Sequence, residues 1–341
     1  MDDCLDIFGQ QTFTINIQSC FCFPLQDNSA CPKNIDTLTK GLERLSTSFP
    51  WLAGQVVNEG SGDGDTDNQD ESAPVFLIRA NFITGGLLTF VAQHNVMDAT
   101  GLTNIIHLFS KACRNEDFTD KERWDGNLSR RDIVPLLEDS HMAGAELNRY
   151  MINAMASLAP PSFVSTDDSL TAFIWQSVAR ARLRRLDSST HSTLCTGHSR
   201  NVYTGFPMKR LIEEPLGTIA LQLRFALSDK LRLEHHTRAI ATFLSRTPDK
   251  SKFSFGASID TTTDLIPSSW AKLEGCCSDF NLGLGLPEAV RKPRCNEVER
   301  LTLLLPKTLE SNVVVAICLR DGDVAELRSD VVFHEHAESI G

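Results

Sequence analysis

The spacing of apolar residues in the first hundred positions predicts a strand, an amphipathic helix and a β-hairpin. Phe13, Ile15 and Ile17 alternate with polar residues, as in a strand that buries one face. Two apolar runs, 75–82 and 87–92, flank Thr84-Gly85-Gly86, where glycine supplies the positive φ that short hairpin turns require. Between the strand and the hairpin, apolar residues recur at helical spacing until Pro50 ends the pattern: Ile35, Leu38, Leu42, Leu45 and Phe49.

Beyond residue 100 the pattern predicts a mixture of helices and strands. Ile105, Leu108 and Ala112 recur at helical spacing, which indicates a helix after Gly101. Ser165-Thr166-Asp167-Asp168 has the form of a capping box that opens another helix. Further elements are expected at 231–243 (a helix) and at 298–305 and 313–319 (two strands).

Chain length and a double proline indicate two domains. A chain of 341 residues corresponds to about two domains by the usual size of a domain. Pro160-Pro161 disfavours helix and stiffens the chain, so it marks the expected junction. We therefore predict domains at 1–159 and 160–341, and the mixture of elements places both in the α/β (α+β) class.

Charge and cysteine content exclude several function classes. The formal net charge of −11 argues against a nucleic-acid partner, because phosphate binding needs clustered Lys and Arg. No run approaches the roughly 18 apolar residues of a membrane span, and the start of the chain lacks the basic residues of a secretory signal, so we expect a cytoplasmic protein with no membrane partner. The ten cysteines contain no Cys-x-x-Cys pair, which favours buried thiols. Asp63, Asp65 and Asp67 alternate as in a calcium loop, but the required glycine and glutamate are absent, so no metal is expected.

The segment from His94 to Gly101 carries the strongest chemical signal in the chain. His94 follows an apolar strand, Asp98 lies four residues further on, and Gly101 precedes a helix. The unperturbed pKa of histidine is about 6.5, so its imidazole can act as a base near neutral pH, and a nearby carboxylate can fix its tautomer. Such a group can deprotonate an alcohol. The alternative is that the two side chains only satisfy each other beside a turn.

A second motif makes the first more specific. Ser268-Ser269-Trp270 is followed by the segment 279–291, which reads Asp-Phe-Asn-Leu-Gly-Leu-Gly-Leu-Pro-Glu-Ala-Val-Arg. Together with His94-x-x-x-Asp98, this segment resembles the BAHD superfamily of coenzyme A-dependent acyltransferases, and most closely the fungal branch typified by trichothecene 3-O-acetyltransferase. The resemblance runs from about Phe13 to the end of the chain. It implies two sandwiched sheet-and-helix domains with a channel between them.

The resemblance also implies roles for individual residues. His94 would be the general base that takes the proton of an acceptor alcohol, whose oxygen then attacks the thioester of acetyl-coenzyme A directly. Asp98 would turn away and pair with an arginine, for which Arg200 is a candidate; alternatively Arg200 is only a solvated cation in a loop. Ser268, Ser269 and the indole N–H of Trp270 are candidates for the oxyanion donors; alternatively Trp270 is only a buried anchor. Asp279 and Gly283, like Gly101, would have structural roles.

Candidate coenzyme A contacts and the length of the chain are the last features that the resemblance brings in. Ser165 and Arg291 are candidate contacts of the cofactor phosphates, although a cap and a solvated cation are the simpler interpretations. Asn281 stands where the family has glycine, and asparagine tolerates the left-handed conformation. The chain is also shorter than the family pattern.

We therefore predict a monomeric acyl-coenzyme A-dependent O-acyltransferase acting on a hydroxylated, trichothecene-like secondary metabolite, with a non-catalytic small-molecule-binding paralogue as the alternative. A carrier-protein condensation domain is disfavoured because Gln93 replaces the first histidine of its His-His motif.

Overall fold

The computed structural model describes most of the chain, with gaps. The predicted features at Phe13, Thr84, 63–67, Pro160-Pro161 and Arg200 lie outside the described residues. The described residues are 4–10, 15–24, 31–57, 72–83, 85–142, 163–196, 202–248, 250, 260–273, 278–293, 299–308 and 310–340.

The first half of the chain builds an antiparallel sheet in the order β4-β5-β1-β9. Strand β5 lies in the interior of the sheet, where Phe90 pairs with Ile78 of β4 and with Ser19 of β1. This confirms the predicted hairpin. Strand β9 comes from the second half of the chain and pairs with β1 over only three residues. The strand bounds are β1 (Asn16–Phe23), β4 (Phe76–Ile83), β5 (Gly85–Gln93) and β9 (Ala289–Arg291).

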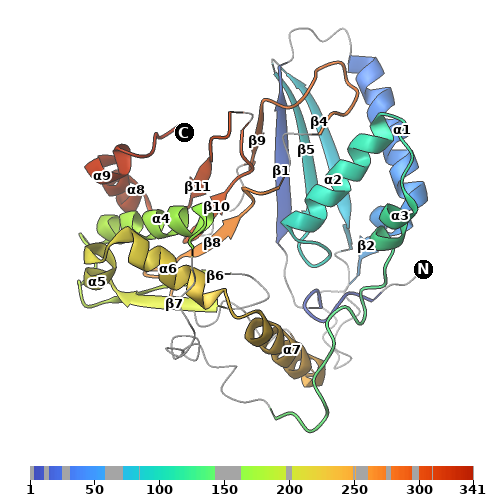
Figure 1. Cartoon of the computed structure of the whole chain (residues 1–341). Helices are drawn as coiled ribbons and strands as arrows, with labels where there is room; N and C mark the ends of the chain where they lie inside the picture. The colour runs from blue at the N-terminus through green and yellow to red at the C-terminus, as the bar shows by residue number, and fades with distance from the viewer. Residues whose placement is uncertain are drawn as a thin grey trace.

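Helices α1 and α2 cover one face of this sheet (Figure 1). Four phenylalanine rings form the centre of the core between them, with each of Phe21, Phe109 and Phe280 within 6 Å of Phe90 between ring centroids. Smaller elements lie beside these helices. The bounds are α1 (Cys31–Ser48), the 3-10 helix η1 (Pro50–Ala53), β2 (Gln55–Val56), β3 (Ala73–Pro74), α2 (Ala99–Cys113) and α3 (Asp120–Gly126).

Helix α1 buries a different face from the one its pattern predicts. Leu38 and Leu45 are buried as expected, but Ile35 and Leu42 are 52% and 40% exposed. The face is set by Gly41, which packs directly on α2: a Cβ there would lie 2.5 Å from the Cys113 Sγ. This close approach turns the stripe centred on Gly41 inward and leaves Ile35 and Leu42 at the surface.

The second half of the chain builds a three-stranded sheet in the order β11-β10-β8, with β8 parallel and β11 antiparallel to β10. The hairpin β6–β7 meets β8 through a bridge between Leu194 and Leu265. Helix α4 packs against α5, α6 and α8 (Figure 1). Trp175 of α4 is fully buried in a second core. The bounds are α4 (Thr166–Arg182), β6 (His191–Thr196), β7 (Val202–Pro207), α5 (Met208–Glu213), α6 (Leu216–Ala226), α7 (Lys230–Arg246), β8 (Ile266–Ser269), β10 (Leu301–Leu304), β11 (Val315–Ile317), α8 (Asp321–Ser329) and α9 (Val331–His334).

The two predicted helices at 165 and 231–243 are confirmed as α4 and α7, and the two late strands as the shorter β10 and β11. None of the described helices has the length and apolar character that crossing a membrane requires. Within the described ranges no three or more His, Cys, Asp or Glu residues gather in a group that could hold a metal ion. Cysteines 20, 113 and 195 are buried, and burial raises the pKa of the Cys113 thiol to about 12.

Candidate active site

His94 lies directly after the last residue of β5, an interior strand of the first sheet. Its backbone N–H donates to the Ile15 carbonyl at 3.0 Å, which extends the pairing of β5 with the β1 segment by one residue. The chain then turns sharply, because the N–H groups of Val96 and Met97 both donate to the Gln93 carbonyl, at 3.0 and 3.1 Å. His94 is half-buried, whereas Val96 and Met97 are buried in the first core. The half-buried histidine is therefore held at the end of a strand whose backbone is fixed by hydrogen bonds.

Asp98 forms the N-cap of α2. Its carboxylate accepts the Gly101 N–H at 2.8 Å, which satisfies one of the free donors in the first turn of the helix. Gly101 is required by space as well, because a Cβ there would lie 2.9 Å from the Met97 Cβ. Asp98 is exposed and makes no ion pair with another residue in the described part of the chain. The structure thus gives Asp98 the task of fixing the start of α2, while the predicted partner Arg200 lies outside the described residues.

Ser268 and Ser269 end β8, and Trp270 follows them. The Trp270 indole N–H donates to the Ser268 Oγ at 3.2 Å, and the Ala271 N–H donates to the Ser269 Oγ at 3.4 Å. Trp270 belongs to the first core, together with Val96 and Met97 from the His94 turn, whereas Ala271 belongs to the second core. The end of β8 therefore lies at the junction of the two halves, next to the same core that the His94 turn borders.

The Asp279 motif lies at the opposite end of α2 from His94. Ser110 and Arg114, both at the end of that helix, donate to the Asp279 carbonyl at 2.7 and 2.6 Å. A helix of 15 residues is about 22 Å long, so the motif is distant from the histidine. Asn281 adopts the left-handed conformation with φ 55°, and Gly283 follows with φ 73°. Asp279 and Gly283 thus lie away from His94, and their structural role stays a prediction.

The two candidate coenzyme A contacts have protein partners in this structure. Ser165 caps α4: its hydroxyl donates to the Asp168 carboxylate at 2.7 Å and accepts from Arg224 at 2.5 Å. Arg224 also donates to the Asp168 carboxylate at 2.7 Å. Arg291 lies in β9, where its Nη1 donates to the Val290 carbonyl at 3.1 Å. Sequence patterns gave no sign of Arg224, because it belongs to no motif.

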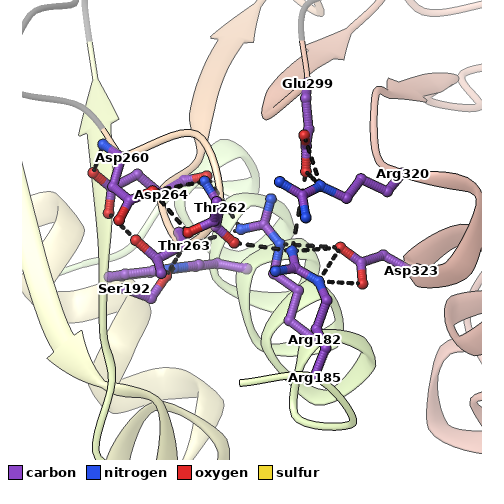
Figure 2. A network of polar contacts seen from close by, with 11 residues as sticks. Arg182, Arg185, Ser192, Asp260, Thr262, Thr263, Asp264, Glu299, Arg320 and Asp323 are labelled. Atoms are coloured by element: carbon purple, nitrogen blue, oxygen red, sulfur yellow. Dashed lines mark hydrogen bonds and ion pairs between the residues drawn. The ribbon is translucent and has the colours of Figure 1, made fainter. Parts of the chain in front are cut away.

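A polar network supports β8 from the side of α4. Arg182, at the end of α4, donates to the Thr263 and Asp264 carbonyls at 2.9 and 3.2 Å, in the turn that leads into β8 (Figure 2). The Asp264 carboxylate in turn accepts the Thr193 N–H at 2.9 Å. Asp323 of α8 accepts hydrogen bonds from the Nε and Nη2 of Arg185, which joins α8 to the same cluster. The network fixes the strand that presents Ser268.

Two surface hollows, of about 520 and 260 Å³, lie around α3 and the end of α1. The larger is lined by α3 and the residues after it, including Trp124 and Leu128, and the smaller includes Arg44 and Phe118. His94 lines neither hollow. The channel to His94 that the sequence resemblance implies stays a prediction.

Comparison with known proteins gives concordant matches. The family described as "Trichothecene 3-O-acetyltransferase-like N-terminal domain" matches residues 15–69 and 63–113. The chain is 38% identical to O-acetyltransferase dmxR13 of Cryptosporiopsis sp., with 100% of this chain and 98% of that protein covered. It is 34% identical to trichothecene 3-O-acetyltransferase of Saccharomyces cerevisiae, with 100% and 96% covered.

Solved structures agree with the sequence matches. The Fusarium sporotrichioides enzyme TRI101, crystallised with coenzyme A and T-2, superposes with a TM-score of 0.90 at 33% identity, and the match covers 99% of each chain. Vinorine synthase superposes with a TM-score of 0.68 at 14% identity over 98% of this chain and 93% of that one, which shows a shared fold.

The matches also show that this chain is shorter than the relatives it aligns with. The dmxR13 alignment runs over 450 positions and nearly the whole of that protein, whereas this chain has 341 residues. At least 109 aligned positions therefore have no counterpart here. Because both ends of the relative are matched, the missing residues are internal.

Proposed function

The chain belongs to the trichothecene 3-O-acetyltransferase-like family, and from this premise we propose that it transfers the acetyl group of acetyl-coenzyme A to a hydroxyl group of a small, trichothecene-like secondary metabolite. The observation that supports this most strongly is the position of His94 at the rim of the first core, in a chain that superposes over almost its full length on an enzyme crystallised with coenzyme A and T-2. No metal takes part in the proposed reaction.

We propose His94 as the general base. Its imidazole takes the proton of the acceptor alcohol while the alcohol oxygen attacks the carbonyl carbon of the thioester. The tetrahedral intermediate then collapses, the carbon–sulfur bond breaks, and the sulfur leaves with the proton that His94 had taken. The products are the acetyl ester and coenzyme A. General-base assistance of this kind contributes roughly a hundredfold to ten-thousandfold to the rate.

For the oxyanion of the intermediate we propose Ser268 as the donor and Trp270 as the residue that orients it. The indole N–H of Trp270 is already directed to the Ser268 Oγ at 3.2 Å. Because that bond occupies a lone pair of the hydroxyl oxygen, the hydroxyl hydrogen is left to point elsewhere and to donate to a developing negative charge. Ser269 is exposed and would serve as a substrate contact.

Asp98 acts at a distance from the reacting atoms in this proposal. It fixes the start of α2, and α2 together with β5 fixes the turn that carries His94. Ser165 and Arg291 stay predictions as coenzyme A contacts. A monomeric state, a cytoplasmic location and the domain division at 159/160 stay predictions as well.

Thiol release tests the function directly. Purified protein is incubated with acetyl-coenzyme A and a panel of secondary and primary alcohols that includes a trichothecene, and free coenzyme A is measured with a thiol reagent. We expect release that depends on the alcohol and falls at least a hundredfold in His94→Ala. His107→Ala is the matched control, because His107 is exposed on α2. No release from the wild type, or equal release from His94→Ala, would reject the proposal; coenzyme A binding without product would instead identify a non-catalytic binding protein.

A further inference from the structure

The turn that carries His94 is held by a hydrogen bond from an arginine that lies beyond α3 in the chain. Arg130 follows α3, and its Nη1 donates to the carbonyl of buried Val96 at 2.6 Å. Its guanidinium carbon lies 4.1 Å from the centroid of the Trp51 ring. The Trp51 indole N–H donates to the Gly126 carbonyl at 2.8 Å. The guanidinium therefore lies over the Trp51 ring and at the same time holds the carbonyl two residues after the histidine.

A second contact reaches the same turn from the segment 5–10. The Asn95 Nδ2 donates to the Gly9 carbonyl at 2.8 Å. A Cβ on Gly9 would lie 2.3 Å from the backbone carbonyl oxygen of Asn95, so only glycine lets the two backbones come this close. The segment is itself folded, because the Asp6 carboxylate accepts the Phe8 and Gly9 N–H groups at 2.9 and 3.0 Å.

We propose that Arg130 and Gly9 are positioning residues for the general base. Neither belongs to the motif that contains His94, yet each fixes the backbone of a residue directly beside it or two positions away. The inference rests on the proposed function, because positioning matters only if the imidazole acts on a bound alcohol. A displacement of about 1 Å can lower the rate of an enzymatic reaction by a hundredfold when the reacting groups are held at contact distance.

The chemistry of the two contacts predicts different sensitivities. Methionine at position 130 preserves the apolar packing on Trp51 but removes the donor to the Val96 carbonyl. Lysine preserves a charged donor but loses the guanidinium that lies over the Trp51 ring, so it should restore activity only partly. Alanine at position 9 forces the Asn95 backbone to move, because the group in its way is a carbonyl oxygen and not a flexible side chain.

Steady-state kinetics of acetyl transfer test the proposal. We expect kcat to fall at least tenfold in Arg130→Met and in Gly9→Ala, with the KM for the acceptor within about twofold of wild type and with an intermediate kcat in Arg130→Lys. Arg131→Met is the control for the arginine, because Arg131 is its exposed neighbour. Gly217→Ala is the control for the glycine, because nothing lies within 4 Å of a Cβ there. Circular dichroism confirms that each variant is folded.

The outcomes separate this proposal from the function itself. If wild type releases coenzyme A, His94→Ala does not, and the folded variants at positions 9 and 130 keep kcat within twofold of wild type, the positioning proposal is wrong and the function stands. A fall in kcat in either folded variant at constant acceptor KM supports the proposal. If a methionine or alanine variant does not fold, the kcat of Arg130→Lys decides. A wild type without activity would overturn the proposed function and this inference with it.

Discussion

Replacing Asp323 by asparagine should destabilise the protein more than any single change at its surface. The Asp323 side chain is 4% exposed and accepts hydrogen bonds from the Nε and Nη2 of Arg185, at 2.9 and 2.8 Å (Figure 2). The Arg182 Nε lies 3.6 Å from the same carboxylate, and the Arg182 side chain is 1% exposed. Asparagine has nearly the same shape but no charge, so the substitution leaves the Arg182 guanidinium buried without its counter-ion.

The size of the effect follows from these distances. At an effective dielectric constant of about 20, two charges 3.6 Å apart attract by roughly 4 to 5 kcal/mol. Removing one partner of a buried ion pair typically costs about 3–5 kcal/mol. The lower end applies here, since the asparagine oxygen can still accept one bond from Arg185, and Arg185 is partly exposed and can regain water. We therefore expect a loss of about 3 kcal/mol in the free energy of unfolding.

Urea denaturation followed by tryptophan fluorescence measures this loss. Trp175 is a suitable probe because its indole N–H donates to the Ser192 Oγ at 2.9 Å, and Ser192 belongs to the same network. Asp125→Asn is the control, because its i,i+4 pair with Lys121 is exposed and should change stability by less than about 0.5 kcal/mol. If Asp323→Asn is as stable as the control, the buried pair does not stabilise the fold and the argument fails.

The pH dependence of the same measurement provides an independent check. Burial alone would raise the pKa of Asp323, but the hydrogen bonds and charge of Arg185, with the charge of Arg182, lower it overall. The unfolded state therefore takes up the proton more readily than the folded state. The stabilisation is present above the unfolded pKa of about 4 and is lost as the pH falls through the lower folded value. The difference between wild type and Asp323→Asn should accordingly be largest near neutral pH and shrink below about pH 4.

Two further predictions concern other parts of the structure. Gly283→Ala should lower the free energy of unfolding by about 1–2 kcal/mol through its positive φ alone, because no atom lies within 4 Å of a Cβ there. Asn281→Gly is the control and should change the free energy of unfolding by less than about 0.5 kcal/mol. Equal stability of wild type and Gly283→Ala in urea would contradict this. Cys113, whose thiol pKa is raised to about 12, should resist iodoacetamide at pH 8 under conditions that alkylate the exposed Cys4. Mass spectrometry of the alkylated native protein measures this. Alkylation of Cys113 at the rate of Cys4 would mean that the interface between α1 and α2 opens readily.

Local patterns predicted the elements that depend on local information. The β4–β5 hairpin, α2 and the capped α4 each have a periodic apolar face together with a turn or capping signal. Strands β8 and β9 have only four and three residues, so periodicity cannot identify them. Their pairing is decided by the tertiary structure, since β9 joins a strand more than 260 residues earlier in the chain.

The same distinction holds for the candidate site. The position of His94 after a strand could be predicted, because the apolar run before it is a local signal. The cap formed by Asp98 was not predicted: the resemblance implied that Asp98 pairs with an arginine, although helix caps have local sequence signals. The contact of Arg130 with the Val96 carbonyl could not be predicted, because no motif encodes it and the two residues meet only through the packing on Trp51. The network around Asp323 is equally non-local, since it joins α4, α8 and the turn before β8.

Although the chain is internally shorter than its relatives, it has the contacts that hold the proposed base, His94. Four of the contacts that hold the His94 turn, with Gly9, Ile15, the Ala73 carbonyl and Arg130, come from the first 130 residues. The core beneath that turn, however, is completed by the second half: Phe280 and Val290 are each 1% exposed and belong to this core, and the Phe280 ring contacts the rings of Phe21 and Phe90. A chain that had lost the ability to bring its second half back to the first would expose those rings to water. A chain with at least 109 fewer residues than the dmxR13 alignment has positions therefore still has the Arg130 contact with the His94 turn and the crossover that buries the core below it.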